Sequence, residues 1–520
     1  MSIRTVLTVL AALVIGAAPG AAQHELGKVT FPTSCDPKVQ ADFERGVAML
    51  HSYWFNYAGK TFRGILERDP NCAIAYWGVA LDLLGNTLAA PPSRQAAREA
   101  WDLLERARTV AVKTERERAW LDAIRAYFRD YETVPLNTRL SAYNEAMKRI
   151  AEQYPDDFEA QVYYALTLQA SAPKNDLTYK NQFESAMLLE KLYLKNPQHP
   201  GITHYLIHAY DFAPFADKGI AAARRYAAIA PAVPHARHMP AHIYSMVGLW
   251  EDSIASNLSA LEIQPDYYHA SDFIVYAHLQ LAQDAKARAM TDKALTTPER
   301  GDRPPTIANF TALAAMPARV ALERADWKAA ASLAITTSDY PQADSLTRFT
   351  RGLGMARTGR PDGAAAEITA LEALRGKLQK ANDAYWAART DEQIAAVNAW
   401  LALADGARDK AASLMRRAAD GEDASVKHVA MENRLYPMRE LLGDLLMEAG
   451  QSKAALAEYT KAIAQNPNRF RGLFGAARAA EASGDRQRAT DYYSKLVQLS
   501  SKGDGVRPEV RKAQEYLAGR

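Results

Sequence analysis

The sequence predicts an all-α protein, built as a right-handed solenoid of helix–turn–helix units. Helix-forming residues dominate, Ala above all, and the Val/Ile alternation typical of β-strands is rare. The C-terminal part repeats itself with a period of about 34 residues, because Ala489 occupies the place of Ala455 in the next unit. The same period recurs in the middle of the chain at Pro197, Pro231 and Pro265. Such a period, with small residues at the helix crossing and a proline at the end of the unit, is the tetratricopeptide repeat (TPR) pattern.

Residues 1–22 predict export from the cytoplasm. Arg4 provides a positive start, "VLTVLAALVIGAA" provides an apolar stretch too short to span a bilayer, and small residues precede Gln23. These are the parts of a cleaved signal peptide. We therefore expect a periplasmic or secreted protein. No later apolar run approaches the roughly 18 residues of a membrane helix, so no membrane span is expected after cleavage.

Three helical segments are expected after the signal peptide. Residues 23–298 should form an N-terminal TPR array with a histidine-rich concave groove, and "PERGDRPPT" (298–306) a joint. Residues 307–430 read as a less regular helical-repeat segment, and 431–520 as a C-terminal TPR pair and tail. Residues 419–437 read as a long functional or linking loop.

The net charge bears on the possible partners, and the cysteine content bears on a possible disulfide. The formal net charge is +3 with both signs interspersed, which together with export argues against a nucleic-acid partner. The chain has two cysteines, Cys35 and Cys72. In an oxidising compartment they could form one structural disulfide, or remain two buried free thiols.

Histidines are concentrated in one stretch of the chain. Of 11 histidines, eight fall within 199–278, at His199, His204, His208, His235, His238, His242, His269 and His278. They also follow the repeat period. His238 and Asp272 lie one and two periods after His204. His242 stands one period after His208, and His269 one period after His235.

This register predicts a metal site. Equivalent positions of successive repeats fall on first helices, which stand side by side in a solenoid about 8–10 Å apart. Imidazoles on neighbouring helices can therefore meet one ion. We expect His204, His208, His238 and His242 as core ligands. Auxiliary ligands are expected at Asp211, Asp272, His235 and His269. Pro240 complicates the pair His238–His242, since a helix starting near Met239 would leave His238 outside it.

The donor set suits zinc, copper or iron, and one ion or two. No metalloprotease "HExxH" pair, "GxSxG" or phosphate-binding glycine motif is present. Such a metal could activate water or dioxygen in an enzyme. The alternative is a non-catalytic TPR scaffold whose groove binds a peptide or partner protein, with the histidines as hydrogen-bonding contacts or as a network that stiffens the solenoid.

Other histidines and aromatics receive structural interpretations. His51 is expected to be a packing residue, His199 a helix cap or a further site residue, and His428 a solvent-facing loop residue. Trp77 and Tyr76 are expected in the core.

Several stretches resemble a family of exported bacterial TPR proteins. They include "FERGVAMLHSYWFNYAGKTF", "HPGITHYLIHAYD" and "PHARHMPAHIY". The resemblance covers essentially the whole mature chain, and its most specific parts are the histidine blocks. It implies a TPR fold and export, and it assigns no activity.

Overall fold

The computed structural model describes residues 26–300, 306–429, 431, 434–505 and 507–519. All regular secondary structure in these residues is helical, which confirms the all-α prediction. The predicted signal peptide lies outside the described residues. Within the described ranges, no helix combines the length and apolarity needed to cross a membrane.

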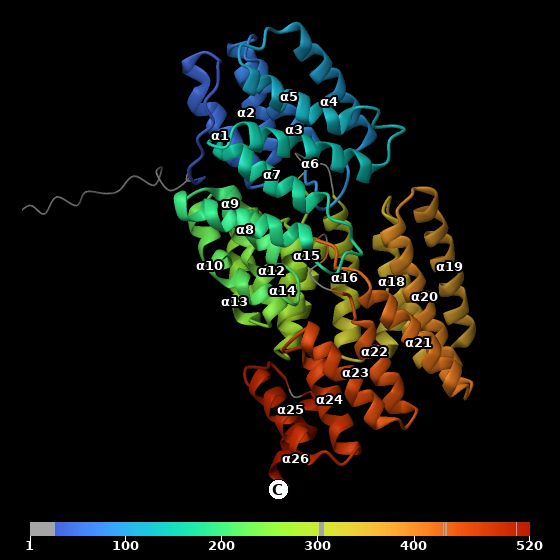
Figure 1. The fold of residues 1–520 in the computed structure, drawn as a ribbon. Coiled ribbons are helices and arrows are strands. Elements are labelled where there is room, and N and C mark those ends of the chain that lie inside the picture. The colour runs from blue at the N-terminus through green and yellow to red at the C-terminus, as the bar shows by residue number, and fades with distance from the viewer. Residues whose placement is uncertain (1–25, 301–305, 430, 432–433, 506, 520) are drawn as a thin grey trace, which may run out of the picture.

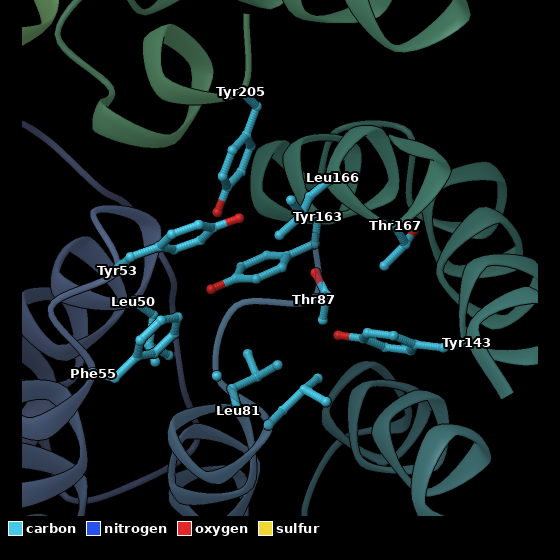
Figure 2. A pocket seen from close by; sticks show the side chains of 12 residues that line it. Leu50, Tyr53, Phe55, Leu81, Thr87, Tyr143, Tyr163, Leu166, Thr167 and Tyr205 are labelled. Atoms are coloured by element: carbon cyan, nitrogen blue, oxygen red, sulfur yellow. The ribbon is translucent and has the colours of Figure 1, made fainter. Parts of the chain in front are cut away.

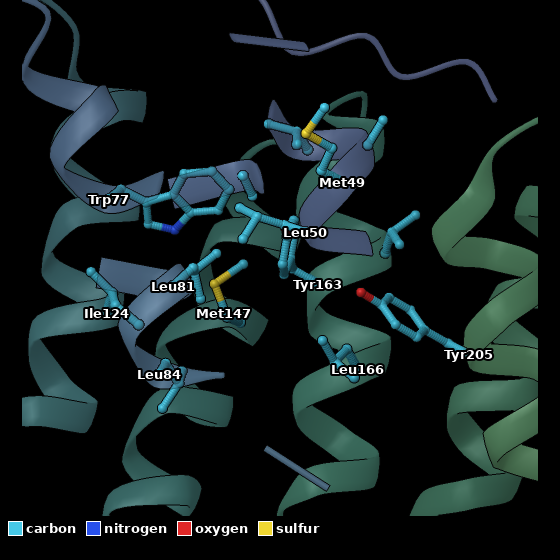
Figure 3. Close-up of a cluster of buried hydrophobic side chains, with 14 of the residues drawn as sticks. Met49, Leu50, Trp77, Leu81, Leu84, Ile124, Met147, Tyr163, Leu166 and Tyr205 are labelled. Atoms are coloured by element: carbon cyan, nitrogen blue, oxygen red, sulfur yellow. The ribbon is translucent and has the colours of Figure 1, made fainter. Parts of the chain in front are cut away.

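Seven α-helices form the N-terminal part, drawn blue to teal in Figure 1. They are α1 (Gln40–His51), α2 (Phe55–Arg68), α3 (Ala73–Leu84), α4 (Arg94–Arg106), α5 (Glu115–Phe128), α6 (Leu136–Gln153) and α7 (Phe158–Ala170). Trp77 is fully buried here, and Tyr76 packs partly buried against the same core. Figure 3 shows Trp77 among the side chains of this core. The prediction of a core Trp77 is confirmed.

A disulfide closes the N-terminal part. Cys35 and Cys72 are bonded, with their Cα atoms 4.7 Å apart. The bond fixes the segment before α1 to the start of α3. Asp69 lies close to both sulfurs. Because the two sulfurs are bonded to each other, they are not thiolates, and this group of three residues is not a metal site.

The middle of the chain carries most of the histidines, on short helices drawn green. The helices are α8 (Lys180–Lys195), α9 (Pro200–Tyr210), α10 (Ile220–Ile229), α11 (Pro234–His238), α12 (Pro240–Val247), α13 (Trp250–Ile263), α14 (Tyr268–Gln280) and α15 (Asp284–Thr296). Helix α12 packs against both α9 and α14. Helix α12, which carries His242, therefore lies next to the helix of His208 and next to the helix of His269.

Eleven further helices complete the described chain. They are α16 (Ile307–Glu323), α17 (Trp327–Ala331), α18 (Pro341–Arg357), α19 (Pro361–Lys380), α20 (Ala384–Ala404), α21 (Arg408–Asp423), α22 (Met438–Glu448), α23 (Ser452–Gln465), α24 (Phe470–Ala482), α25 (Arg486–Leu499) and α26 (Pro508–Ala518). Residues on both sides of the predicted boundary at 430 contribute to one hydrophobic cluster.

The C-terminal helices pack back onto the middle of the chain, as Figure 1 shows for the red segment beside α13 and α14. Arg469 is fully buried and pairs with Glu323 at 2.8 Å and Glu440 at 2.7 Å. It also donates to the hydroxyl of Tyr276 on α14. Arg507 donates to Asp284 at the start of α15.

The long loop is shorter than predicted, because α21 continues to Asp423. Residues 419–423 are therefore helical, and the connection to α22 begins at Ala424. This connection reaches the N-terminal half. The backbone N–H of Val426 donates to the carbonyl of Lys174, and Lys427 reaches Asp211.

Candidate metal centre

The helices place six imidazoles in two groups of three. Pro200 begins α9, where its missing N–H costs little, so His204 and His208 lie one turn apart on it. In the first histidine cluster, formed by His204, His208 and His235, Nε2 of His204 lies 3.1 Å from Nε2 of His208. The same atom lies 3.0 Å from Nε2 of His235. Three ring nitrogens thus converge on one point from two elements.

The second histidine cluster consists of His238, His242 and His269. The helix does break after His238, because α11 ends there and α12 starts at Pro240. The two rings nevertheless meet, with Nε2 atoms 3.1 Å apart. The reason is that Met239 keeps helical dihedral angles, φ −52° and ψ −36°. His269 of α14 joins them, with its ring centroid 4.8 Å from that of His238.

The two clusters adjoin. Ring centroids are 6.1 Å apart between His208 and His242 and 6.0 Å apart between His235 and His238. Five of the six rings are buried, and His235 is half-buried. The arrangement is therefore one compact region with two points of convergence.

Hydrogen bonds to the outer ring nitrogens fix three tautomers. Nδ1 of His204 lies 2.6 Å from the carbonyl oxygen of His51, which can only accept. Nδ1 of His242 lies 2.9 Å from the carboxylate of Asp211. Each Nδ1 therefore carries the proton and donates it, which leaves the lone pair of Nε2 facing the cluster.

His238 has the same arrangement through an amide. Its Nδ1 lies 2.6 Å from Oδ1 of Asn257. The amide nitrogen of Asn257 donates to the carbonyl of Ser253, which fixes the amide orientation. The Nε2 atoms of His238 and His242 are thus both acceptors at a separation of 3.1 Å. Two facing lone pairs cannot form a hydrogen bond with each other, and a cation between them would satisfy both.

Burial keeps these rings neutral. It lowers the pKa of His204 from 6.5 to about 3 and that of His238 from 6.5 to about 4. The pKa values of His208, His235, His242 and His269 are also lowered well below 6.5, first by burial and then by neighbouring charges. A shared proton is therefore a poor cation for this region near neutral pH.

The two predicted carboxylates lie beside the clusters and are engaged by cations. Oδ2 of Asp211 accepts from His242 and pairs with Lys427 at 2.9 Å. Burial raises the pKa of Asp211, and the Lys427 ammonium opposes that shift. Asp272 lies on α14, yet its two oxygens accept from Nε and Nη2 of Arg319, at 2.9 and 3.3 Å. Among the described residues, each cluster is thus built from imidazoles alone.

Comparisons with known proteins add no assignment. No protein-family model matches the chain, and no curated protein does either. The function is therefore inferred from the site itself.

A third buried group was not anticipated from the sequence. Glu159 on α7 accepts from Nε2 of His51 at 2.7 Å and from Nε2 of His199 at 2.8 Å. Nδ1 of His199 accepts from the backbone N–H of Ile202, so His199 caps α9. Since that cap places the proton on Nε2, His199 donates to Glu159 and offers no lone pair there. This tautomer makes the group a hydrogen-bonded network and a poor metal site.

The same network supports the first cluster. Burial alone would raise the pKa of Glu159, but the two imidazoles hold it at about 2. His51 is fixed by Glu159 and by the Tyr205 hydroxyl, 3.0 Å from its Nδ1. Its carbonyl in turn orients His204. His51 thus lies in the core, as expected, and acts on a candidate ligand through its backbone.

The prediction of a solvent-facing His428 is wrong. Its side chain is 8% exposed and packs against Tyr385 and Trp386. The part of the connection from α21 to α22 that carries Val426 and His428 turns inward rather than outward, so both side chains are buried. Lys427, which no sequence pattern distinguishes, reaches the site on the same connection.

Proposed function

We propose that this protein binds two transition-metal ions, one on each histidine cluster. The observation that carries the proposal is the pair of acceptor nitrogens, His238 Nε2 and His242 Nε2, held 3.1 Å apart. Two ligand nitrogens bound to one tetrahedral ion at 2.0–2.1 Å are roughly 3.3 Å apart. The separations in both clusters are close to this value.

The donor set favours copper or zinc over iron. Non-haem iron sites usually combine two imidazoles with a carboxylate. Here Asp211 and Asp272 are held by Lys427 and Arg319. Three imidazoles per ion fit zinc or copper, and copper has the higher intrinsic affinity for nitrogen ligands.

Three protein ligands leave a coordination position for another molecule. An ion held in this way supplies Lewis acidity or activates a bound small molecule such as water or dioxygen. The chain's own residues fix the ligand tautomers through Asp211, Asn257 and the His51 carbonyl. Burial excludes bulk water from most of the ring surfaces. More specifically, we therefore propose that the protein is a metalloenzyme.

Elemental analysis of the purified protein tests the binding. We expect about two equivalents of copper or zinc after loading and dialysis, and about one in the double variant His238→Asn/His242→Asn. The matched control is His278→Asn on α14, because His278 bonds to Gln283 outside both clusters. Loading below a tenth of an equivalent in the unaltered protein, or equal loading in all variants, would refute the proposal.

We further propose that the helices form a TPR-type solenoid and that the protein is exported to the periplasm. Support comes from the repeat register, because His208, His242 and Tyr276 follow one another at one period and lie on α9, α12 and α14, and α12 packs against the other two helices. Export is tested by fractionating cells and sequencing the mature N-terminus, expected at Gln23. A chain that keeps Met1 in the cytoplasm would contradict it.

The scaffold alternative receives less support. A peptide groove needs exposed side chains, whereas His204 and His238 are fully buried and pack on other imidazoles. A protein partner elsewhere on the surface is compatible with metal binding.

A further inference from the structure

The two histidine clusters meet along two pairs of rings. The ring centroids of His208 and His242 are 6.1 Å apart, and those of His235 and His238 are 6.0 Å apart. Within the second cluster, the rings of His238 and His242 are in contact, with centroids 4.9 Å apart. Within the first cluster, His208 and His235 both converge on Nε2 of His204. The two clusters therefore face each other across one shared boundary.

The ring spacing places each ion close to this boundary. An ion bound to an imidazole nitrogen lies roughly 3 Å from the centroid of that ring. The three centroids of the second cluster are 4.9, 4.8 and 5.7 Å apart, so a point about 3 Å from all three exists. Since the facing rings of the two clusters are only 6.1 and 6.0 Å apart, two ions with this reach can approach to about 4 Å. At that spacing two metal ions share one ligand.

The charge of the site favours copper in its monovalent state. The ligand rings are neutral and mostly buried, so they leave the charge of a bound ion uncompensated. The carboxylate of Asp211 already pairs with Lys427. The carboxylate of Asp272 already pairs with Arg319. Two divalent ions bring four positive charges into this region, whereas two cuprous ions bring two. Because an uncompensated buried charge is costly, the cuprous pair is the more stable one.

A pocket next to the first histidine cluster admits only very small molecules. Tyr53, Tyr163 and Tyr205 are among its lining residues, and its volume is about 20 Å³, enough for about one water molecule (Figure 2). Tyr53 connects it to the cluster, because its ring centroid lies 4.5 Å from that of His204 and 5.2 Å from that of His235. An organic substrate does not fit on this side of the cluster, whereas a molecule of two atoms is close in size to the space.

We propose that the two clusters form one dinuclear copper site, which binds dioxygen between the two ions. This inference rests on the proposed metal binding. Each cuprous ion gives one electron, so both ions become cupric and dioxygen becomes peroxide, with one oxygen bonded to each ion. No proton and no other reductant takes part. Three imidazoles leave a coordination position on each ion for this bridge. The peroxide dianion offsets the two added positive charges, so the net charge of the buried site does not change.

Oxygen uptake and electron paramagnetic resonance of the full-length protein test the pairing. The protein is loaded with cuprous ions under argon and then exposed to dioxygen. We expect one dioxygen molecule to be consumed for every two copper ions. The resonance should then account for at most about a tenth of the copper, because a bridging ligand pairs the two unpaired electrons.

Variants separate one cluster from two. The double variant His238→Asn/His242→Asn keeps only the first cluster, so its copper, oxidised with ferricyanide, should give the full signal of one spin per ion. The matched control His278→Asn should behave like the unaltered protein, because His278 bonds to Gln283 outside both clusters. Circular dichroism checks that each variant is folded.

The unaltered protein alone can refute the pairing. Two bound copper ions that give the full signal after oxidation, or that consume no dioxygen, would overturn this inference and leave the proposed metal binding intact. Copper loading below a tenth of an equivalent would refute both.

Discussion

Replacing Asp211 with Leu should separate metal binding from fold stability. Oδ2 of Asp211 lies 2.9 Å from Nδ1 of His242 and 2.9 Å from Nζ of Lys427. The side chains of Asp211 and Lys427 are 2% and 8% exposed. Asp211→Leu leaves the Lys427 charge buried without a carboxylate, which costs about 3–5 kcal/mol. It also removes the acceptor that sets the tautomer of His242, which should weaken metal binding about 10–100-fold.

The double variant Asp211→Leu/Lys427→Met distinguishes the two effects. With both charges removed, stability should return to within about 1–2 kcal/mol of the unaltered protein. The metal affinity should stay about 10–100-fold weaker, because the tautomer of His242 is still not set. Urea unfolding measures the first quantity and competition with a chelator the second. Asp156→Leu on the exposed surface is the control. Recovery of the metal affinity in the double variant would refute the role given to Asp211.

Three further outcomes are expected. A Cβ at Gly201 would lie 2.4 Å from Nδ1 of His51, so Gly201→Ala should displace that ring and cost about 1–3 kcal/mol in urea unfolding; an unchanged midpoint would contradict the close packing. The Cys35–Cys72 bond spans 37 residues, so replacing both cysteines with Ser should cost about 4 kcal/mol, also measured with urea; a loss below about 1 kcal/mol would count against it. The metal-free protein should lose stability as pH falls from 6.5 to about 4, because His238 takes up a proton over this range only when unfolded; a urea midpoint independent of pH there would contradict the buried neutral ring.

Much of the candidate site could be predicted from the sequence, because residues one repeat period apart lie close together in space. Positions one period apart share one place on successive units. His208 and His242 therefore lie on two packed helices, α9 and α12. All six clustered imidazoles were among the predicted ligands. The division into two clusters was not predicted, since it depends on which way each ring turns.

The remaining features depend on contacts that no period encodes. Asp272 keeps the expected register, but Arg319 of α16 occupies its carboxylate. Glu159 is one acidic residue on an ordinary helix, and only its burial between two imidazoles distinguishes it. Lys427 is remote from Asp211 in the chain and reaches it through an irregular connection. A sequence pattern does not fix the path of such a connection.

Because α24–α26 pack back onto α13–α15, the ends of this molecule should not unfold independently of its centre. A linear stack of helix pairs touches only its neighbours, so its end units can fray one at a time. Here the last units are tied to the centre through the fully buried Arg469 and through Arg507. Detaching the tail would strip the fully buried Glu323 of its cation, far back along the chain. The two distant parts of the polypeptide should consequently melt together, and clipping off the tail should loosen the helix that carries His269.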